Sequence, residues 1–196
     1  MELSEAILKR RMVRNFTGEA VSEKDLNRML ELALHAPSAG FSQGWSFIVV
    51  KDEARRKEVG RIQGEEGYDS GGFGKFVSKA PVLIVACTSE QVYHRRYQEK
   101  DKVNEDGAEI DWPTPYWFFD IGAATMIILL AAVDMGYAAA FTGTFDPEGM
   151  KKLLGIPQEY HPVGVISLGR GAKDKKSPSL KRGRKDAGQV VHYEKW

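Results

Sequence analysis

The chain has 196 residues, with 28 Lys or Arg, 27 Asp or Glu, and a formal net charge of +1 at pH 7. This balance excludes a polybasic protein of the histone type. The single cysteine, Cys87, excludes an internal disulfide and a zinc site built on several cysteines. The length predicts one domain over residues 1–196. Because the N-terminal segment MELSEAILKRR is charged where a signal peptide needs apolar residues, we expect a cytoplasmic protein.

Helices and strands alternate along the chain, which predicts an α/β or α+β protein with a mixed central sheet. The apolar spacing predicts helices over 3–11, from Ser22 to the residues before Pro37, 53–62 and 147–154, and strands over 45–50, 81–87, 137–141 and 163–168. Five glycines indicate a loop over 64–74. The strand over 81–87 is apolar without alternation, so we expect both faces of the sheet to be covered.

The segment from Phe118 to Val133 is the longest apolar stretch of the sequence. Asp120 interrupts it and leaves 13 uncharged residues from Ile121 onward, whereas a membrane span needs about 20. Apolar side chains occur at every angle around this helix, which is typical of a helix inside a protein or between two subunits. We therefore expect no membrane partner.

Two further segments do not follow the alternation of helices and strands. Residues 91–115 are a long polar and aromatic insertion, and loops of this length are commonly functional or disordered. Prolines stiffen its aromatic end around Trp112 and Tyr116, so we predict that residues 91–117 form a lid, with ordinary packing as the alternative. Residues 170–196 lack periodicity but end in apolar side chains, which predicts an arm that packs on a neighbouring subunit.

Basic side chains mark two candidate anion sites. Arg10 and Arg14 are four residues apart, which predicts that they share a helical face and, with Arg11, form a phosphate clamp. The alternative is a group of cations stabilised by a helix C-terminus. Arg182 and Arg184 lie in the basic C-terminal stretch, which indicates phosphate binding, nucleic-acid binding or a solvated tail. The near-neutral net charge argues against nucleic acid as a partner.

The loop APSAGFSQGW, before the strand over 45–50, is rich in small and hydroxylated residues. It allows a ligand to approach the backbone near Ser38, or it is simply a tight turn. No pattern for nucleophilic catalysis or metal binding is present, because the four histidines lack ligand spacing and Cys87 lies in an apolar strand. An enzyme with this sequence would take its chemistry from a bound cofactor.

The chain resembles the flavin-dependent nitroreductase family in the order and spacing of six segments, which are RRMVRNF, APSAGFSQGWSFIVV, KAPVLIVAC, FTGTFDPEGMKKLLGIP, PVGVISLGRG and SLKRGRK. The apolar helix led by Asp120 and Gly122 is a further element of this resemblance. The resemblance implies an α+β nitroreductase-like fold and an intertwined homodimer that exchanges its C-terminal arms. It also implies that each subunit contributes to FMN sites at the dimer interface, and that the apolar helix and the arm build that interface.

The same resemblance implies which residues bind FMN. By position they are Arg10, Arg11, Arg14, Pro37, Ser38, Ala39, Lys75, Thr142, Gly143, Thr144, Arg182 and Arg184. The arginines match the phosphate and ribityl contacts, the loop at Ser38 reaches the flavin from the other subunit, and the turn at Gly143 faces the flavin N5. The substrate pocket is expected to include Phe41, Trp112 and Tyr116.

The activity implied is electron transfer from NADH or NADPH, through FMN, to a small oxidised acceptor such as a nitroaromatic, quinone or enone. It runs as two half-reactions at one site, and no side-chain acid or base is required. Three residues depart from the family pattern: Met12 stands where Ser is usual, Phe41 where Asn is common, and Gly44 where Pro is frequent. The alternative function is a non-redox flavin-binding protein for storage, sensing or cofactor remodelling.

Overall fold

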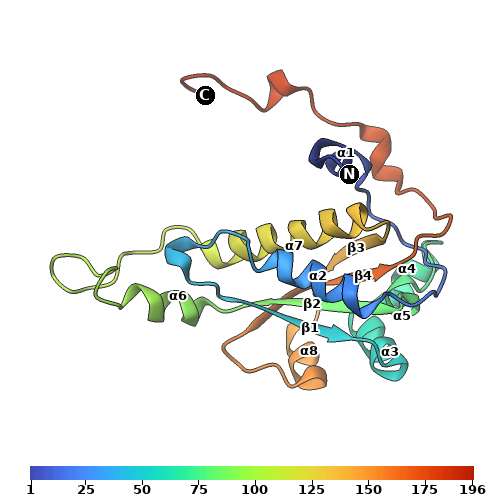
Figure 1. Cartoon of the computed structure of the whole chain (residues 1–196), viewed down its shortest axis with the longest axis horizontal. Coiled ribbons are helices and arrows are strands. Elements are labelled where there is room, and N and C mark those ends of the chain that lie inside the picture. The colour runs from blue at the N-terminus through green and yellow to red at the C-terminus, as the bar shows by residue number, and fades with distance from the viewer.

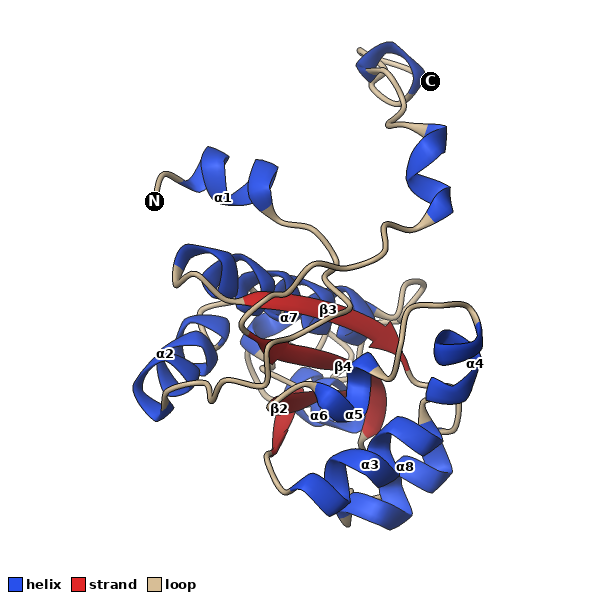
Figure 2. Cartoon of the chain, turned by 90° about the vertical axis from the view of Figure 1, so that its right-hand side faces the viewer, coloured by secondary structure: helices blue, strands red, loops and turns tan.

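A computed structural model describes all residues, 1–196, and shows helices packed on both faces of one four-stranded sheet (Figure 1). The strands are β1 (Trp45–Val50), β2 (Val82–Thr88), β3 (Ala138–Gly143) and β4 (His161–Gly169), in the spatial order β1-β2-β4-β3. Every neighbouring pair is antiparallel, so the predicted mixed sheet is wrong. The continuous apolar run of β2 reflects burial by helices on both faces, which central antiparallel strands also receive (Figure 2).

Eight α-helices accompany the sheet. They are α1 (Leu3–Lys9), α2 (Glu23–Ala33), α3 (Glu53–Ile62), α4 (Glu65–Ser70), α5 (Phe76–Lys79), α6 (Glu90–Tyr97), α7 (Tyr116–Asp134) and α8 (Pro147–Leu154). The glycine-rich stretch over 64–74, predicted as a loop, contains α4. The start of the insertion is helical as well, since it forms α6.

The core is divided between the two faces of the sheet. On one face α2 and α7 cover a cluster that includes Met29, Ile84 and Ile128. On the other face α3, α5 and α8 cover a second cluster that includes Leu83 and Val165. Neighbouring residues of β2, such as Leu83 and Ile84, therefore belong to different clusters, as strand geometry requires.

Helix α7 is only partly covered by the rest of the chain. Nine of its 19 residues are buried, but Phe119 is 69% exposed and Phe118 and Met126 are each 44% exposed. By length and composition α7 is apolar enough to cross a membrane, yet half of its most apolar stretch is buried in the protein. It is therefore a core helix that also leaves an apolar strip on the surface.

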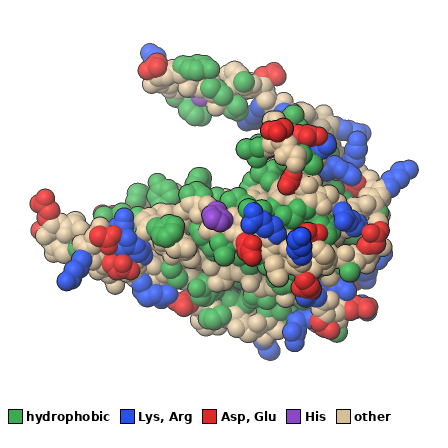
Figure 3. Space-filling view, viewed as in Figure 1, with side chains coloured by type: hydrophobic (Ala, Val, Ile, Leu, Met, Phe, Trp, Pro, Cys, Tyr) green, Lys and Arg blue, Asp and Glu red, His purple; other side chains and the backbone are tan.

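Helix α1 and the C-terminal arm project from the body (Figures 1 and 2). The arm contains two short 3-10 turns, η2 (Pro178–Arg182) and η3 (Ala187–Gln189), and its apolar residues are exposed, with Trp196 at 99%. Apolar side chains also line the surface of the body that faces the arm (Figure 3). A contiguous exposed apolar surface of this kind marks an interaction site.

Several side chains attach the rest of the insertion to α6, among them Asp101, which pairs with Arg96 at 2.6 Å, and Glu109. Glu109 accepts hydrogen bonds from His94 Nδ1 at 2.6 Å and from Trp112 Nε1 at 2.5 Å. The Trp112 ring packs edge-on against Tyr97, with 4.5 Å between the ring centroids. The hydrogen bond to Glu109 raises the pKa of His94 above its ordinary value of 6.5, since it outweighs the opposing effect of burial.

The raised pKa of His94 predicts that the attachment of the insertion depends on pH. A histidine with a raised folded-state pKa contributes stability that is present below about pH 6.5 and is lost as pH rises through the folded-state value. We expect proton NMR titration to give a pKa above 6.5 for His94, and proteolysis within 98–111 to accelerate as pH rises through it. Glu109→Gln should return the pKa toward 6.5; an unchanged pKa in that variant would contradict the attachment.

Candidate functional site

The first candidate cluster follows the end of α1. Arg10 is extended, with φ −60° and ψ 125°, and Met12 forms an isolated parallel bridge with Ala139 on the edge strand β3. Arg10 and Arg14 therefore do not share a helical face, and that prediction is wrong.

The three arginines have different partners. Arg11 forms an ion pair with Asp174 at 2.7 Å, and the same carboxylate accepts the backbone N–H of Arg14 at 3.1 Å. Burial raises the pKa of Asp174, but these hydrogen bonds outweigh it and hold the pKa below its ordinary value. Arg11 is thus neutralised by a carboxylate that ties the start of the arm to the N-terminal segment.

The guanidinium groups of Arg10 and Arg14 have no carboxylate partner. Arg10 Nη1 is buried without any hydrogen-bond acceptor. The Arg14 guanidinium lies over the rings of Phe73 and Phe76, at 5.3 and 5.9 Å from their centroids. A buried donor without an acceptor is costly, and guanidinium groups match the oxygens of phosphate. This cluster is therefore suited to an anionic ligand.

Met12 points toward the sheet rather than toward this cluster. Its sulfur accepts the backbone N–H of Phe141 at 3.3 Å. The residue that departs from the usual Ser thus packs against β3, and the edge of that strand is partly paired by the N-terminal segment, since Val13 N–H donates to Ala139 at 3.0 Å.

The end of β3 carries Thr142 and Gly143, followed by Thr144. Gln63, at the end of α3, is completely buried and donates to Thr142 Oγ1 at 3.0 Å and to the Gly143 carbonyl at 3.1 Å. This glutamine orients the predicted turn, and sequence reasoning missed it because nothing marks one polar residue at a helix end as buried. Lys75 is half-buried, and its ammonium group pairs with Glu66 at 2.5 Å.

The loop with Pro37, Ser38, Ala39 and Phe41 connects α2 to β1 and includes the 3-10 turn η1 (Ala39–Phe41). Ser38 Oγ accepts the backbone N–H of Gln43 at 3.0 Å. Phe41 and Gln43 have φ of 57° and 52°, a region that residues other than glycine rarely adopt. Phe41 is 72% exposed, so the loop holds an aromatic side chain out toward solvent.

The predicted lid residues pack on their own subunit. Trp112 is half-buried and contacts the rings of Tyr97, Trp117 and Tyr116, while Tyr116 is 43% exposed. The Trp112 indole thus belongs to an aromatic cluster on α6 and α7. This packing agrees with the alternative interpretation of the insertion, and it leaves Tyr116 as the more accessible ring.

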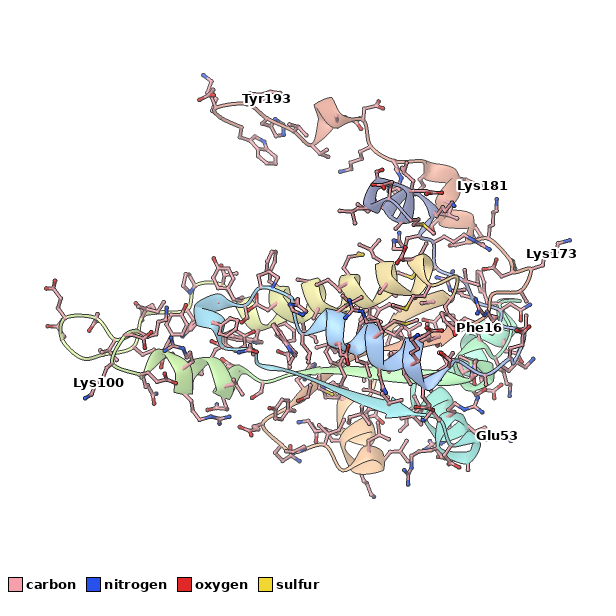
Figure 4. The ribbon with its side chains drawn as sticks, in the orientation of Figure 1. Phe16, Glu53, Lys100, Lys173, Lys181 and Tyr193 are labelled. Carbon is pink, nitrogen blue, oxygen red and sulfur yellow. The ribbon has the colours of Figure 1, made fainter.

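A single chain does not bring the predicted site together. The insertion, marked by Lys100, and the segment after α1, marked by Phe16, lie at opposite ends of the molecule (Figure 4). Arg182 and Arg184 lie in the exposed arm and form no hydrogen bond or ion pair through their side chains. The binding residues predicted from the sequence therefore form separate groups within a single chain.

Other chemistry is not supported by the structure. No group of three or more His, Cys, Asp or Glu side chains is arranged to hold a metal ion. Cys87 is buried in β2, and burial raises the pKa of its thiol to about 12, so it is a packing residue as predicted. Nucleophilic catalysis by this cysteine is excluded at neutral pH.

Comparison with known proteins agrees with the fold. The chain is 30% identical, over 100% of its length and 99% of the relative, to an Archaeoglobus fulgidus protein provisionally named NADH dehydrogenase/NAD(P)H nitroreductase. It is 26% identical to the NADPH-flavin oxidoreductase of Vibrio harveyi, over 96% of this chain and 72% of that protein. The structure of an iodotyrosine deiodinase bound to FMN and 3-iodo-L-tyrosine superposes with a TM-score of 0.75, covering 100% of both chains at 21% identity. Residues 7–170 match the Nitroreductase family, and the chain belongs to this family.

Proposed function

We propose that this protein is an FMN-dependent oxidoreductase of the cytoplasm that transfers electrons from NADH or NADPH to a small oxidised acceptor. Membership of the nitroreductase family and relatives named as NAD(P)H nitroreductase and NADPH-flavin oxidoreductase support an oxidoreductase. The observation that carries the cofactor assignment is the pair of arginines, Arg10 and Arg14, whose guanidinium groups lack a carboxylate partner.

The phosphate of FMN fits these two residues. It would supply the acceptor that the buried Arg10 Nη1 lacks, and it would satisfy the charge of Arg14 above Phe73. Arg11 has a different role in this proposal, because Asp174 already neutralises it. Arg182 and Arg184 lie in the exposed arm and form no side-chain hydrogen bond or ion pair, so we assign them to a site that a second copy completes.

The second copy is part of the proposal for two reasons. The apolar strip of α7 and the apolar residues of the arm are exposed in one chain, and pairing two chains would bury them. In addition, the phosphate cluster and the loop at Ser38 lie in separate groups, so a flavin site needs one group from each subunit. We therefore propose a homodimer that exchanges its arms and holds FMN at the interface.

When bound, FMN would supply the redox chemistry that connects a nicotinamide donor to the acceptor. The residues of this chain hold and orient it. Gln63 fixes the turn at Thr142 and Gly143, and Lys75, neutralised by Glu66, is a weaker candidate for a charged flavin contact. For the acceptor we propose a pocket wall formed by the exposed Phe41 and Tyr116 and by the aromatic cluster around Trp112, which suits flat acceptors such as nitroaromatics, quinones or enones.

The phosphate assignment predicts a selective loss of FMN affinity. Arg14→Ala and Arg184→Ala should each weaken FMN binding by at least about 1.5–3 kcal/mol, the typical worth of a charge-assisted hydrogen bond. Riboflavin, which lacks the phosphate, should bind both variants as it binds the wild type. Fluorescence titration with the two flavins measures both values. An equal loss of FMN and riboflavin, or full retention of FMN on dialysis, would contradict the phosphate site.

The dimer predicts that cofactor and subunit association are linked. Deleting residues 188–196 should lower the melting temperature and increase flavin loss together, because the arm and the site would share one interface. Sedimentation velocity of the wild type should show a dimer, and thermal melting with and without added FMN should show a smaller stabilisation in the truncated chain. A monomer that retains its flavin would overturn this part of the proposal.

A further inference from the structure

The loop between α2 and β1 is held in a strained shape by contacts from two helices. Arg96 of α6 donates from Nε to the Gly40 carbonyl at 3.0 Å, and Asp120 of α7 accepts the backbone N–H of Ala39 through Oδ2 at 2.9 Å. A side chain at Gly40 would collide with Tyr97, since an added Cβ would lie 2.5 Å from the ring. The loop cannot shift toward α6 without breaking this packing, and residues in the left-handed region persist only under such constraint.

Asp120 is the unusual member of this set of contacts. Asp120 is only 3% exposed and forms no ion pair. Its second hydrogen-bond donor is the hydroxyl of Tyr93, which donates to Oδ2 at 2.8 Å. Burial and the neighbouring carboxylate raise the pKa of Tyr93, so the phenol stays protonated and remains a donor.

A buried carboxylate without a cation is costly in an apolar helix, and an apolar residue at this position would avoid that cost. The carboxylate does not lengthen or cap α7, because it lies in the second turn and its bonds go to α6 and the loop. The carboxylate fixes the backbone N–H of Ala39, the residue that follows Ser38 in the loop that would reach the flavin. Helix α7 also carries the apolar strip assigned to the dimer interface, so Asp120 connects that interface to the loop.

We propose that Asp120 is a positioning residue that holds the Ser38–Gln43 loop against the ring of a flavin bound between two subunits. This inference rests on the proposed function. Tyr93 supports Asp120 by donating to the same oxygen, and the two residues act through the backbone of Ala39 rather than by touching the acceptor.

The first test measures the loop itself in the full-length protein, with and without FMN. In Asp120→Ala, hydrogen exchange in peptides covering 38–43 should accelerate by about tenfold or more, because a hydrogen bond to a charged group is lost. Asp120→Asn should show a smaller increase, since its amide oxygen still accepts. Asp25→Ala is the matched control: Asp25 accepts the hydroxyl of Tyr137 at 2.7 Å near the other end of α7 but contacts no residue of the loop. An increase in 38–43 no larger than in the control would overturn the proposal.

The second test distinguishes contacts to the flavin ring from contacts to the FMN phosphate. Loss of the positioned loop should weaken the binding of riboflavin and of FMN by the same factor, about fivefold for one hydrogen bond. Loss of Arg14 should weaken the binding of FMN alone. The bound flavin should also show a shifted absorption spectrum and midpoint potential in Asp120→Asn, at full flavin occupancy, and neither should shift in Asp25→Ala. If the wild-type protein binds neither flavin, the proposed function itself is refuted. If the wild-type protein binds both flavins, and both Asp120 variants keep its affinity and spectrum, only the role of Asp120 is refuted.

Discussion

Helix α7 is apolar around its whole circumference, and a single sheet can cover only part of it. The sheet and α2 bury one side, with Ile128 among the completely buried residues, while Phe119 stays 69% exposed. Removing such a strip from water requires a second surface, and the exposed apolar arm is of the same character. Helix α1 and the arm extend from the body instead of covering this strip (Figure 1).

The same helix determines how polar groups are used near its first turns. Asp120 is buried there with no cation, and it is satisfied only by Tyr93 and by the backbone of Ala39. A hydrogen-bonded carboxylate in an apolar setting tolerates little movement of its partners, because each lost bond leaves charge unsatisfied. The loop after α2 is therefore tied to α6 and α7, although Phe41 at its tip is exposed.

At the other end of the sheet, the segment that carries the three arginines is extended instead of helical, and the arginines have different partners. The segment pairs with β3 through Val13 and with the start of the arm through Phe16. Arg11 then meets Asp174, whereas Arg10 and Arg14 remain available for an anion. The three arginines carry the same charge, but they differ in function because the Asp174 carboxylate pairs with only one of the three guanidinium groups.

Local sequence patterns were sufficient for most elements. The strand over 45–50 and the helices over 53–62 and 147–154 were predicted with the bounds that the structure has, because short apolar periods and turn residues fix them locally. The order of six segments was sufficient for the family, which the match over residues 7–170 confirms. The inert character of Cys87 also followed from its apolar neighbours.

Contacts between distant residues were beyond the reach of the sequence. The direction of the strands was predicted wrongly, because a buried strand is apolar on both faces whether its neighbours are parallel or antiparallel. Ala39, which donates to Asp120, is 81 residues away from it, and Asp174, the partner of Arg11, is 163 residues away. The sequence by itself determined the elements, the family and the candidate residues; only the tertiary structure decided which charges are paired and which side chains share a surface, because those depend on how the elements pack.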